Sequence, residues 1–469
     1  MPTNTTILNI DDHPALTDPT PFDQFDPLKA DGPDQGSDFQ ASAYPQLIQT
    51  AESSVLGSFF NMTNAIVGAG IIGLPFAFKE AGYFTGMILL LTLAYITDWT
   101  LRLLAHATKL SGRSTYQELV CFCFGRIGFH AISFFQFVFA FGGMCAFNVI
   151  IGDTVPHVIR SVVPGVLSSP VLTFLTSRRA MITLITLFIS FPLSLYRDMG
   201  KLAKTSALAL VAMLVIVVAV VIEAPKAAPE LRGNNIGKWA FMKPDVFQAI
   251  GVMGFAFVCH HNSFMIYSAL KTPTLDRYAR VIRLSTILSA TVCLVLASVG
   301  YLNFTDKTRG NILNNFPDNN LLINIARFCF GFNMITTFPM ELLVAREVID
   351  GYVSLYSQPK SASNHTEVPF SMTRHVGVTT AMVLATLFVA LSVCDLGIII
   401  ELTGGVSATA LAFILPAACH LKLGSGPLLT RAKLPLWLLL GFGICVLFLS
   451  PTLAIYRFIH QDPSEMHIC

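Results

Sequence analysis

Long uninterrupted runs of apolar residues restrict what this chain can fold into. Residues 206–222 read SALALVAMLVIVVAVVI and contain no charged residue. A helix of roughly 20 apolar residues crosses a hydrocarbon core of about 30 Å, whereas barrel strands are about half as long and alternate in polarity. Only 12% of all residues are charged, against roughly a quarter in soluble domains. The chain is therefore expected to be an all-α polytopic membrane protein.

Hydropathy in windows of about 19 residues predicts about eleven transmembrane helices. They cover residues 55–78, 83–108, 128–152, 179–196, 204–223, 244–270, 283–304, 320–346, 375–394, 397–420 and 434–458. Residues 114–124 are amphipathic and are expected to lie along the membrane surface. The transmembrane domain thus extends over residues 53–458.

The two ends of the chain lie outside this domain. Residues 1–52 contain nine acidic residues and a single basic one, Lys29. Such a segment cannot bury enough apolar surface to fold alone, so a disordered cytoplasmic tail is expected there, followed at the other end by a short tail at 459–469. The net charge of +2 and the lack of a basic face exclude nucleic acid as a partner.

Basic residues in the loops favour a cytoplasmic amino terminus, because this orientation places 17 of them inside and 11 outside. It also places the acceptor sequence that begins at Asn303 at the outer end of the seventh span, where glycosylation is expected. The similar triplet at Asn364 falls in an inner loop and should remain unmodified.

The first span is interrupted in a way that does not suit a lipid-facing helix. Asn61 and Asn64 place amide groups at membrane depth, and Gly68, Gly70 and Gly73 follow them. Close packing through small residues would account for the glycines. The buried amides need partners, however, and an unwound stretch that lines a cavity supplies them.

The sixth span carries a matching interruption, in which His260, His261 and Asn262 follow Gly254 within an otherwise apolar segment. Interrupted segments at corresponding places in two halves indicate an inverted-repeat transporter. Five spans plus five, with an eleventh appended, fit that arrangement. An unwound segment exposes backbone N–H groups that favour a carboxylate, and its free carbonyls can hold an ammonium group, so the site suits an amino acid.

Three motifs also resemble those of the amino acid/auxin permease family, which includes sodium-coupled neutral amino acid transporters and fungal vacuolar amino acid transporters. They are NMTNAIVGAGIIGLPFA at 61–77, FAFVCHHN at 255–262, and TFPME at 337–341 followed by AREVI at 345–349. The resemblance extends over residues 53–458 and implies a LeuT-type core with broken first and sixth helices.

The resemblance also implies a substrate site. The backbone around the first break would receive the substrate carboxylate near Asn61 and Asn64, and the sixth helix would shape the side-chain pocket. The implied residues are Gly68, Ala69, Gly70, Ile71, Phe255, Phe257 and Val258. A bulky residue at Gly70 is expected to abolish uptake while largely sparing the fold.

Two coupling ions remain open. On the family pattern, a sodium ion would lie between the first and eighth helices, near Asn64, Val67, Asn333, Thr336 and Thr337. The threonine hydroxyls could equally bond back to their own helix. Proton coupling is the alternative, with His260 and His261 as titrating groups and Glu341 as an intramembrane carboxylate of the kind that marks proton routes.

Other charges within the spans have structural interpretations as well as functional ones. Asp98 and Arg102 lie one helical turn apart and are expected to form a local ion pair. Glu401, like Glu341, is a candidate for an ion route, although either could instead pair with Arg327.

The sequence contains no catalytic set, no phosphate-binding loop and no cluster of metal-ligating residues, so neither an enzyme nor an ATP-driven pump is expected. A secondary active transporter of neutral amino acids, working by symport or antiport, fits best. The alternative is an amino-acid sensor that signals through residues 1–52. A vacuolar or lysosome-like membrane is favoured over the plasma membrane, and a monomeric transport unit without cofactor, apart from a bound sodium ion, is expected.

Overall fold

The protein is described from a computed structural model over residues 53–163, 165, 169–196, 206–235, 237–357, 371–393 and 395–460. The predicted tail at 1–52, the triplet at Asn364 and residues 461–469 lie outside these ranges. The helices, in chain order, are α1 Val55–Val67, η2 Ala69–Gly73, α2 Leu74–Ala81, α3 Tyr83–Ser111, α4 Tyr116–Val162, α5 Pro170–Leu175, α6 Arg178–Ile185, η4 Thr186–Ser190, α7 Phe191–Ser194, α8 Ser206–Glu223, η6 Ala224–Lys226, η7 Pro229–Leu231, α9 Val246–Phe257, α10 His260–Ala269, α11 Leu275–Phe304, η8 Thr305–Lys307, η9 Ile312–Asn315, α12 Leu321–Ser357, α13 Met372–Ser392, α14 Leu396–Thr403, η10 Gly404–Ala408, η11 Ala410–Ile414, α15 Leu415–Leu423, η12 Arg431–Lys433 and α16 Leu434–His460.

Within the described residues, 10 helices are long and apolar enough to cross a membrane. The all-helical prediction is confirmed, and each of these helices coincides with an expected span. The expected fourth span, 179–196, is the exception. It forms a helix from Arg178 through α6, η4 and α7 to Ser194, at the short end of the range of about 17–25 residues that cross a membrane.

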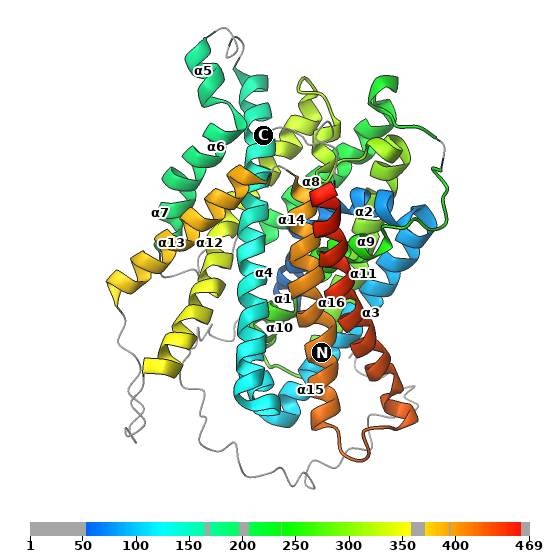
Figure 1. Cartoon of the computed structure of the whole chain (residues 1–469), viewed down its shortest axis with the longest axis vertical. Coiled ribbons are helices and arrows are strands. Elements are labelled where there is room, and N and C mark those ends of the chain that lie inside the picture. Colours follow the sequence, from blue (N-terminus) through cyan, green and yellow to red (C-terminus); the bar gives the residue numbers. More distant parts are fainter. Residues whose placement is uncertain are drawn as a thin grey trace, which may run out of the picture. The chain divides into compact units, whose positions relative to one another are not determined.

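A kink at Gly125 divides α4 into two helices. Gly125 has φ 61° and ψ −144°, a conformation that glycine adopts at little cost. The short helix before the kink starts with a cap, since the Glu118 N–H donates to Thr115 Oγ1 over 3.1 Å and the Glu118 carboxylate accepts from the Ser114 N–H over 3.0 Å. The predicted amphipathic segment at 114–124 is therefore a separate helix, which turns away from α4 at its lower end in Figure 1.

The broken first and sixth spans pack against each other and against helices from both halves of the chain. The long helices α4 and α12 pack against each other, while α1 packs against α11 and α8. The second half of the first span, α2, packs against α9 and α11. The last helix, α16, lies along α9 and α14, and Figure 1 shows it in red beside α14. The two broken spans thus lie inside the bundle, where side chains of several helices reach them.

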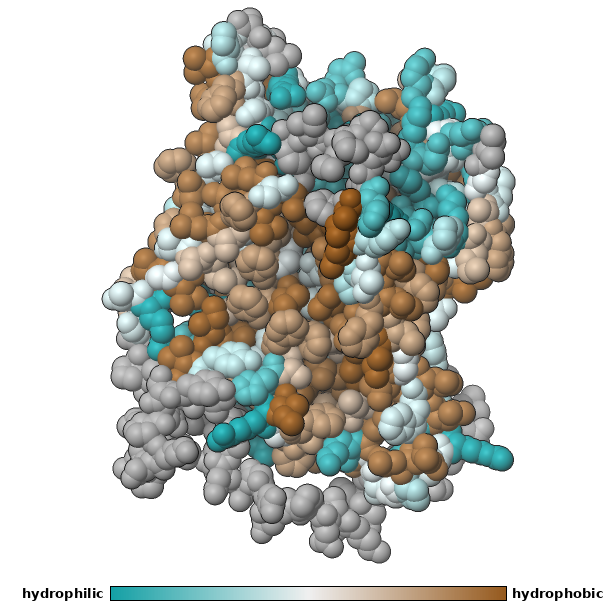
Figure 2. Space-filling view, viewed as in Figure 1, coloured by the Kyte–Doolittle hydropathy of each residue, from teal (hydrophilic) through white to brown (hydrophobic). Residues whose placement is uncertain are grey.

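The outward faces of the helices carry large apolar side chains. Ile127 is 80% exposed, and Phe188 and Phe388 are each 72% exposed. In Figure 2 such side chains extend across the middle of the face shown, whereas hydrophilic side chains gather toward the upper right and along the lower edge. Exposed apolar area of this extent matches a lipid-facing surface.

Candidate functional site

The first span is broken where the sequence predicted it. Helix α1 ends at Val67, and the next residue, Gly68, has φ −46° and ψ −146°. A single 3-10 helix, η2, connects α1 to α2. Pro75 occupies the first turn of α2, where its missing N–H leaves no bond unmade. The polypeptide therefore crosses the bundle as two half-helices with a tight turn between them.

The sixth span is broken as well, between α9 and α10. Val258 and Cys259 leave the helical conformation, with ψ angles of 116° and 12°. Gly254 lies within α9, and His260 begins α10. The interruption is thus shorter than the sequence suggested and falls on these two residues.

The two breaks lie against each other. A Cβ atom placed on Gly70 would lie 2.5 Å from Cα, 2.8 Å from Cβ and 2.9 Å from N of Ala256. One turn away, the Cys259 Sγ lies 3.6 Å from the Met62 Sδ. Only glycine permits this approach of η2 to α9, which explains Gly70 through backbone packing.

Backbone hydrogen bonds also connect the outer ends of the half-helices. At the beginning of α1, the Ser53 N–H donates to Ala269 O over 3.0 Å, and the Lys271 N–H donates to Ser53 O over 2.9 Å. At the far end of α2, the Lys243 N–H donates to Ala81 O over 3.0 Å. Since the first and sixth spans are joined at both ends and at their breaks, they form one unit.

The first turn of η2 contains backbone N–H groups that the helix itself does not bond. The first N–H groups of a helix have no intrahelical partner, and in η2 these belong to Ala69 and Gly70. The first hydrogen bond of the turn begins only at Ile71, whose N–H lies 3.3 Å from Gly68 O. Among the described residues, Thr63 Oγ1 and Asn64 Oδ1 are buried without a partner. The end of α1 and the turn after it thus combine N–H donors with free side-chain oxygens, a suitable environment for a zwitterion.

Aromatic side chains of α9 and α4 lie beside the break in the sixth span. Phe255, Phe257 and Val258 are all at least 94% buried, as expected for pocket residues. Phe139 of α4 lies 5.5 Å from the Phe255 ring and 4.8 Å from the His261 ring, measured between centroids. Phe139 therefore touches both sides of the sixth-helix break. As one of five phenylalanines at 134–141, it carries no signal that distinguishes it in the sequence.

The two histidines of α10 differ in their surroundings. His260 Nε2 lies 2.8 Å from Thr100 Oγ1, and this hydroxyl also lies 2.8 Å from Ile96 O. This hydrogen bond makes His260 a structural partner of α3, with the donor set by the tautomer of the imidazole ring. In contrast, both ring nitrogens of His261 are buried without a partner among the described residues.

Glu341 lies on the same side of α4 as His261. A Cβ atom on Gly143 would lie 3.8 Å from Glu341 Cγ, and Gly143 is one turn from Phe139, which contacts His261. Glu341 Oε2 is buried without a partner among the described residues. Intramembrane carboxylates are costly and often functional, so Glu341 and His261 are candidates here to bind a cation or a proton, as is His260 through its unpartnered Nδ1.

The residues expected to bind sodium come from two helices. Asn64 and Val67 belong to α1, and both this helix and α12 pack against α8. On α12, the hydroxyls of Thr336 and Thr337 donate to Asn333 O over 2.9 and 2.8 Å. These threonines thus bond back to their own helix, one of the two alternatives raised by the sequence, while their oxygens retain lone pairs that could coordinate a cation.

Two further predictions concern residues away from the breaks. Arg102 and Asp98 form the expected ion pair along α3. Asn303 lies in the last turn of α11, where its side-chain amide donates to Val299 O over 2.8 Å. This helical placement does not favour glycosylation, which stays a prediction.

Arg327 pairs with neither intramembrane glutamate, contrary to one alternative. It is fully buried and donates to Leu313 O and Phe316 O, each over 2.8 Å. Asp153 of α4 holds the same loop, accepting from Asn314 Nδ2 over 3.0 Å. Nothing in the sequence alone connects these side chains with the loop at 305–320.

This loop covers the end of the first break. A Cβ on Gly310 would lie 2.6 Å from Gly397 N, and a Cβ on Gly73 would lie 3.7 Å from Gly310 O. The loop is thus packed between η2 and the beginning of α14.

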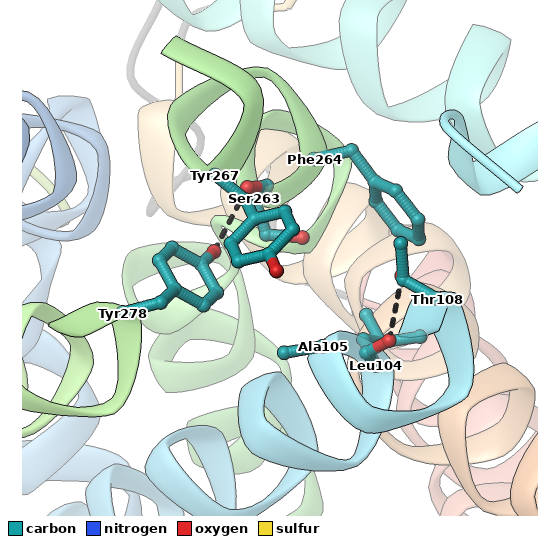
Figure 3. Close-up of a pocket in the computed structure, with 7 residues that line it drawn as sticks. All are labelled: Leu104, Ala105, Thr108, Ser263, Phe264, Tyr267 and Tyr278. Carbon is teal, nitrogen blue, oxygen red and sulfur yellow. Dashed lines mark hydrogen bonds between the residues drawn. The ribbon is translucent and has the colours of Figure 1, made fainter. Parts of the chain in front are cut away.

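A small cavity lies between α3, α10 and α11 (Figure 3). Its volume is about 10 Å³, room for about one water molecule. The Tyr278 hydroxyl, directed toward α10 in Figure 3, donates to Ser263 O over 2.8 Å. The Thr108 hydroxyl donates to Leu104 O over 2.7 Å. These polar groups are already bonded, so the cavity is not a second substrate site.

Comparisons with known proteins agree with this geometry. Residues 51–459 match the family described as transmembrane amino acid transporter protein. The chain is 38% identical to vacuolar amino acid transporter 2 of Saccharomyces cerevisiae, over 88% of this chain and 86% of that protein. It is also 38% identical to putative sodium-coupled neutral amino acid transporter 11 of Danio rerio, over 89% of this chain and 90% of that protein.

The fold is similar to a solved transporter. A crystal structure of a mutant of the Eremococcus coleocola manganese transporter superposes with a TM-score of 0.52, covering 91% of this chain and 90% of that one at 13% sequence identity. The likeness concerns the fold alone and supports the predicted LeuT-type arrangement.

Proposed function

The chain belongs to the transmembrane amino acid transporter family, and we propose that it is a secondary active transporter that moves neutral amino acids by alternating access. Amino acid transport follows from the family match over residues 51–459. The observation that carries the mechanism is the contact of η2 with α9 at Gly70 and Ala256, because it joins two broken helices around one set of free backbone donors.

The substrate binds, in this proposal, with its carboxylate on the N–H groups of Ala69 and Gly70, next to Gly68 and to Ile71, whose N–H already donates to Gly68 O. The helix dipole of the following half-helix favours a negative charge there. Asn61 and Asn64 lie one to two turns before the break and supply amide groups to the same space. The apolar walls formed by Phe255, Phe257 and Val258 suit an uncharged side chain, and Phe139 completes this wall.

Two ions remain candidates for coupling. Thr336, Thr337 and Asn333, together with Asn64 and the carbonyl of Val67, would provide the oxygen ligands that sodium prefers. His261 and Glu341 would serve protons, because both have buried polar atoms without partners among the described residues. His260 is the weaker candidate, since Thr100 already occupies its Nε2.

A vacuolar or lysosome-like membrane is proposed as the location, in line with the name of the similar protein from Saccharomyces cerevisiae. The excess of basic residues in alternate loops supports a cytoplasmic amino terminus. A single chain would form the transport unit, because both broken helices and their contacts belong to one chain. The sensor alternative gains no support from these relatives, whose names describe transporters.

The test is uptake of labelled amino acids into proteoliposomes under an imposed sodium gradient, an imposed pH gradient, or neither. Accumulation above equilibrium is expected with one of the two gradients, and the effective gradient identifies the coupling ion. Binding of amino acids without accumulation under any gradient would refute secondary active transport.

A further inference from the structure

One arginine connects the distal ends of both broken helices to the last helix. Arg457 lies in the last turn of α16, and its Nη2 is 2.6 Å from Glu80 Oε2 and 2.9 Å from Asp245 Oδ1. Glu80 lies near the end of α2, and Asp245 immediately precedes α9. A single guanidinium group thus holds a carboxylate from each of the two broken spans.

The ion pair with Glu80 is sheltered from solvent. Glu80 is 6% exposed, while the side chains of Arg457 and Asp245 are 31% and 42% exposed. A buried carboxylate is strongly destabilised when it loses the cation that pairs with it. The contact therefore constrains how α2 can move relative to α16.

Arg457 is not needed to join α2 to α9. Lys243 already does so, since its N–H donates to Ala81 O and its Nζ donates to Lys79 O, each over 3.0 Å. These bonds make α2 and the start of α9 one unit. What Arg457 adds is a connection from this unit to α16, which packs along α9 and α14.

A further carboxylate lies near the same guanidinium. Glu401 of α14 is 2% exposed, and its Oε1 is buried without a partner among the described residues. Arg457 attracts this carboxylate electrostatically, whereas Glu80, Asp395 and Asp245 repel it. Because α14 packs against α16, this unpaired carboxylate is an ionic partner on a neighbouring helix to which Arg457 can transfer.

We propose that Arg457 is a positioning residue of the transport cycle. It holds α2 and α9 against α16 in the arrangement seen here, and it transfers to Glu401 when the end of the bundle that carries Arg457 opens. The proposal rests on the alternating access proposed above. On opening, Glu80 and Asp245 become hydrated, and Arg457 keeps an ionic partner on α14. The exchange of partners lowers the cost of leaving the closed arrangement.

The test measures opening directly, by labelling a cysteine at a buried position. Val252 of α9 is fully buried, and its Cγ1 would lie 3.3 Å from a Cβ on Gly73. The variant Val252→Cys, in the full chain with the native cysteines replaced, is reconstituted in proteoliposomes. Its reaction with a membrane-impermeant maleimide then reports how often this face opens.

Arg457→Gln removes the charge, and we expect labelling to become about tenfold faster, which corresponds to roughly 1.4 kcal/mol in the closed–open equilibrium. Glu401→Gln removes the alternative partner, and labelling should become slower. The matched control is Arg374→Gln, because Arg374 pairs with Asp350 over 3.0 Å with similar side-chain exposures of 26% and 41%. It should leave the labelling rate unchanged.

Equal labelling rates in the parent, Arg457→Gln and Glu401→Gln would overturn the proposal, as would an equal acceleration by Arg374→Gln. Should Arg457→Gln fail to fold, Arg457→Lys and Glu401→Gln decide. The lysine variant should accelerate labelling by less than glutamine would, because it keeps the positive charge near both carboxylates, which share the single Nη2 atom of Arg457. Labelling requires no amino acid, so its result is independent of whether uptake is observed.

Discussion

The packing of Gly70 against Ala256 yields a quantitative prediction. In Gly70→Ala, the added methyl group would lie 2.5 to 2.9 Å from backbone and Cβ atoms of Ala256. Backbone atoms cannot rotate away as a long side chain can, so η2 and α9 must separate. Overpacking of this kind costs about 1–3 kcal/mol, equivalent to an about 5- to 150-fold loss of the packed arrangement.

Gly68→Ala is the matched control, because it adds the same methyl group within the same turn. Its Cβ would find Asn64 O at 3.6 Å as its nearest neighbour, an ordinary contact. Purified variants should therefore differ in apparent melting temperature, with Gly70→Ala lowered and Gly68→Ala close to the parent. Initial uptake rates measured in parallel should fall in Gly70→Ala by a factor within the same range.

The second substitution Ala256→Gly, combined with Gly70→Ala, tests the steric contact itself. It removes the Ala256 Cβ but leaves Cα and N, the atoms at 2.5 and 2.9 Å, so it should restore only part of the stability. Equal melting temperatures for Gly70→Ala and Gly68→Ala would refute the packing argument. The structure also revises the expectation that a bulky residue at Gly70 largely spares the fold, because any side chain there meets the α9 backbone.

Three further predictions concern charged and hydroxyl side chains. Asp153→Ala removes the acceptor for Arg178, Asn311 and Asn314 and should destabilise the protein by about 3–5 kcal/mol. The control Asp318→Ala removes the 51% exposed partner of His157 and should cost less than about 1 kcal/mol. Equal shifts in melting temperature for the two variants would contradict the importance of the buried cluster around Asp153. Glu341→Gln should abolish uptake driven by a pH gradient while preserving exchange of labelled for unlabelled amino acid, and unaltered pH-driven accumulation would exclude Glu341 as the proton site. Replacing Thr336 and Thr337 together by Ala should raise the sodium concentration needed for half-maximal uptake if sodium is the coupling ion, while Thr380→Ala, which removes a similar bond to Val376 O at 2.8 Å, should not.

Apolar periodicity and local interruptions were sufficient to predict the helices and the position of the first break. A run long enough to cross a bilayer has few alternatives to a helix, since every backbone group must be satisfied within the segment. The prolyl ring at Pro75 likewise acts through local backbone geometry, whereas Gly70 is required by its contact with Ala256 of α9. The sixth break could not be placed to the residue in this way, because His260 already belongs to α10 and only Val258 and Cys259 leave the helical conformation.

Contacts between distant segments were decided by the tertiary structure alone. Arg327 and Glu401 stand out in the sequence as unusual, but a side chain's partner depends on which helices become neighbours. Arg327 thus proved to bind carbonyl groups of the loop before α12, and Arg457, which the sequence placed merely at the end of the last span, bridges Glu80 and Asp245. Helix formation follows from residues a few positions apart, whereas the Arg327 bonds join residues 11 and 14 positions apart and the Arg457–Glu80 ion pair joins residues 377 positions apart. Only the packed bundle brings them within hydrogen-bonding distance.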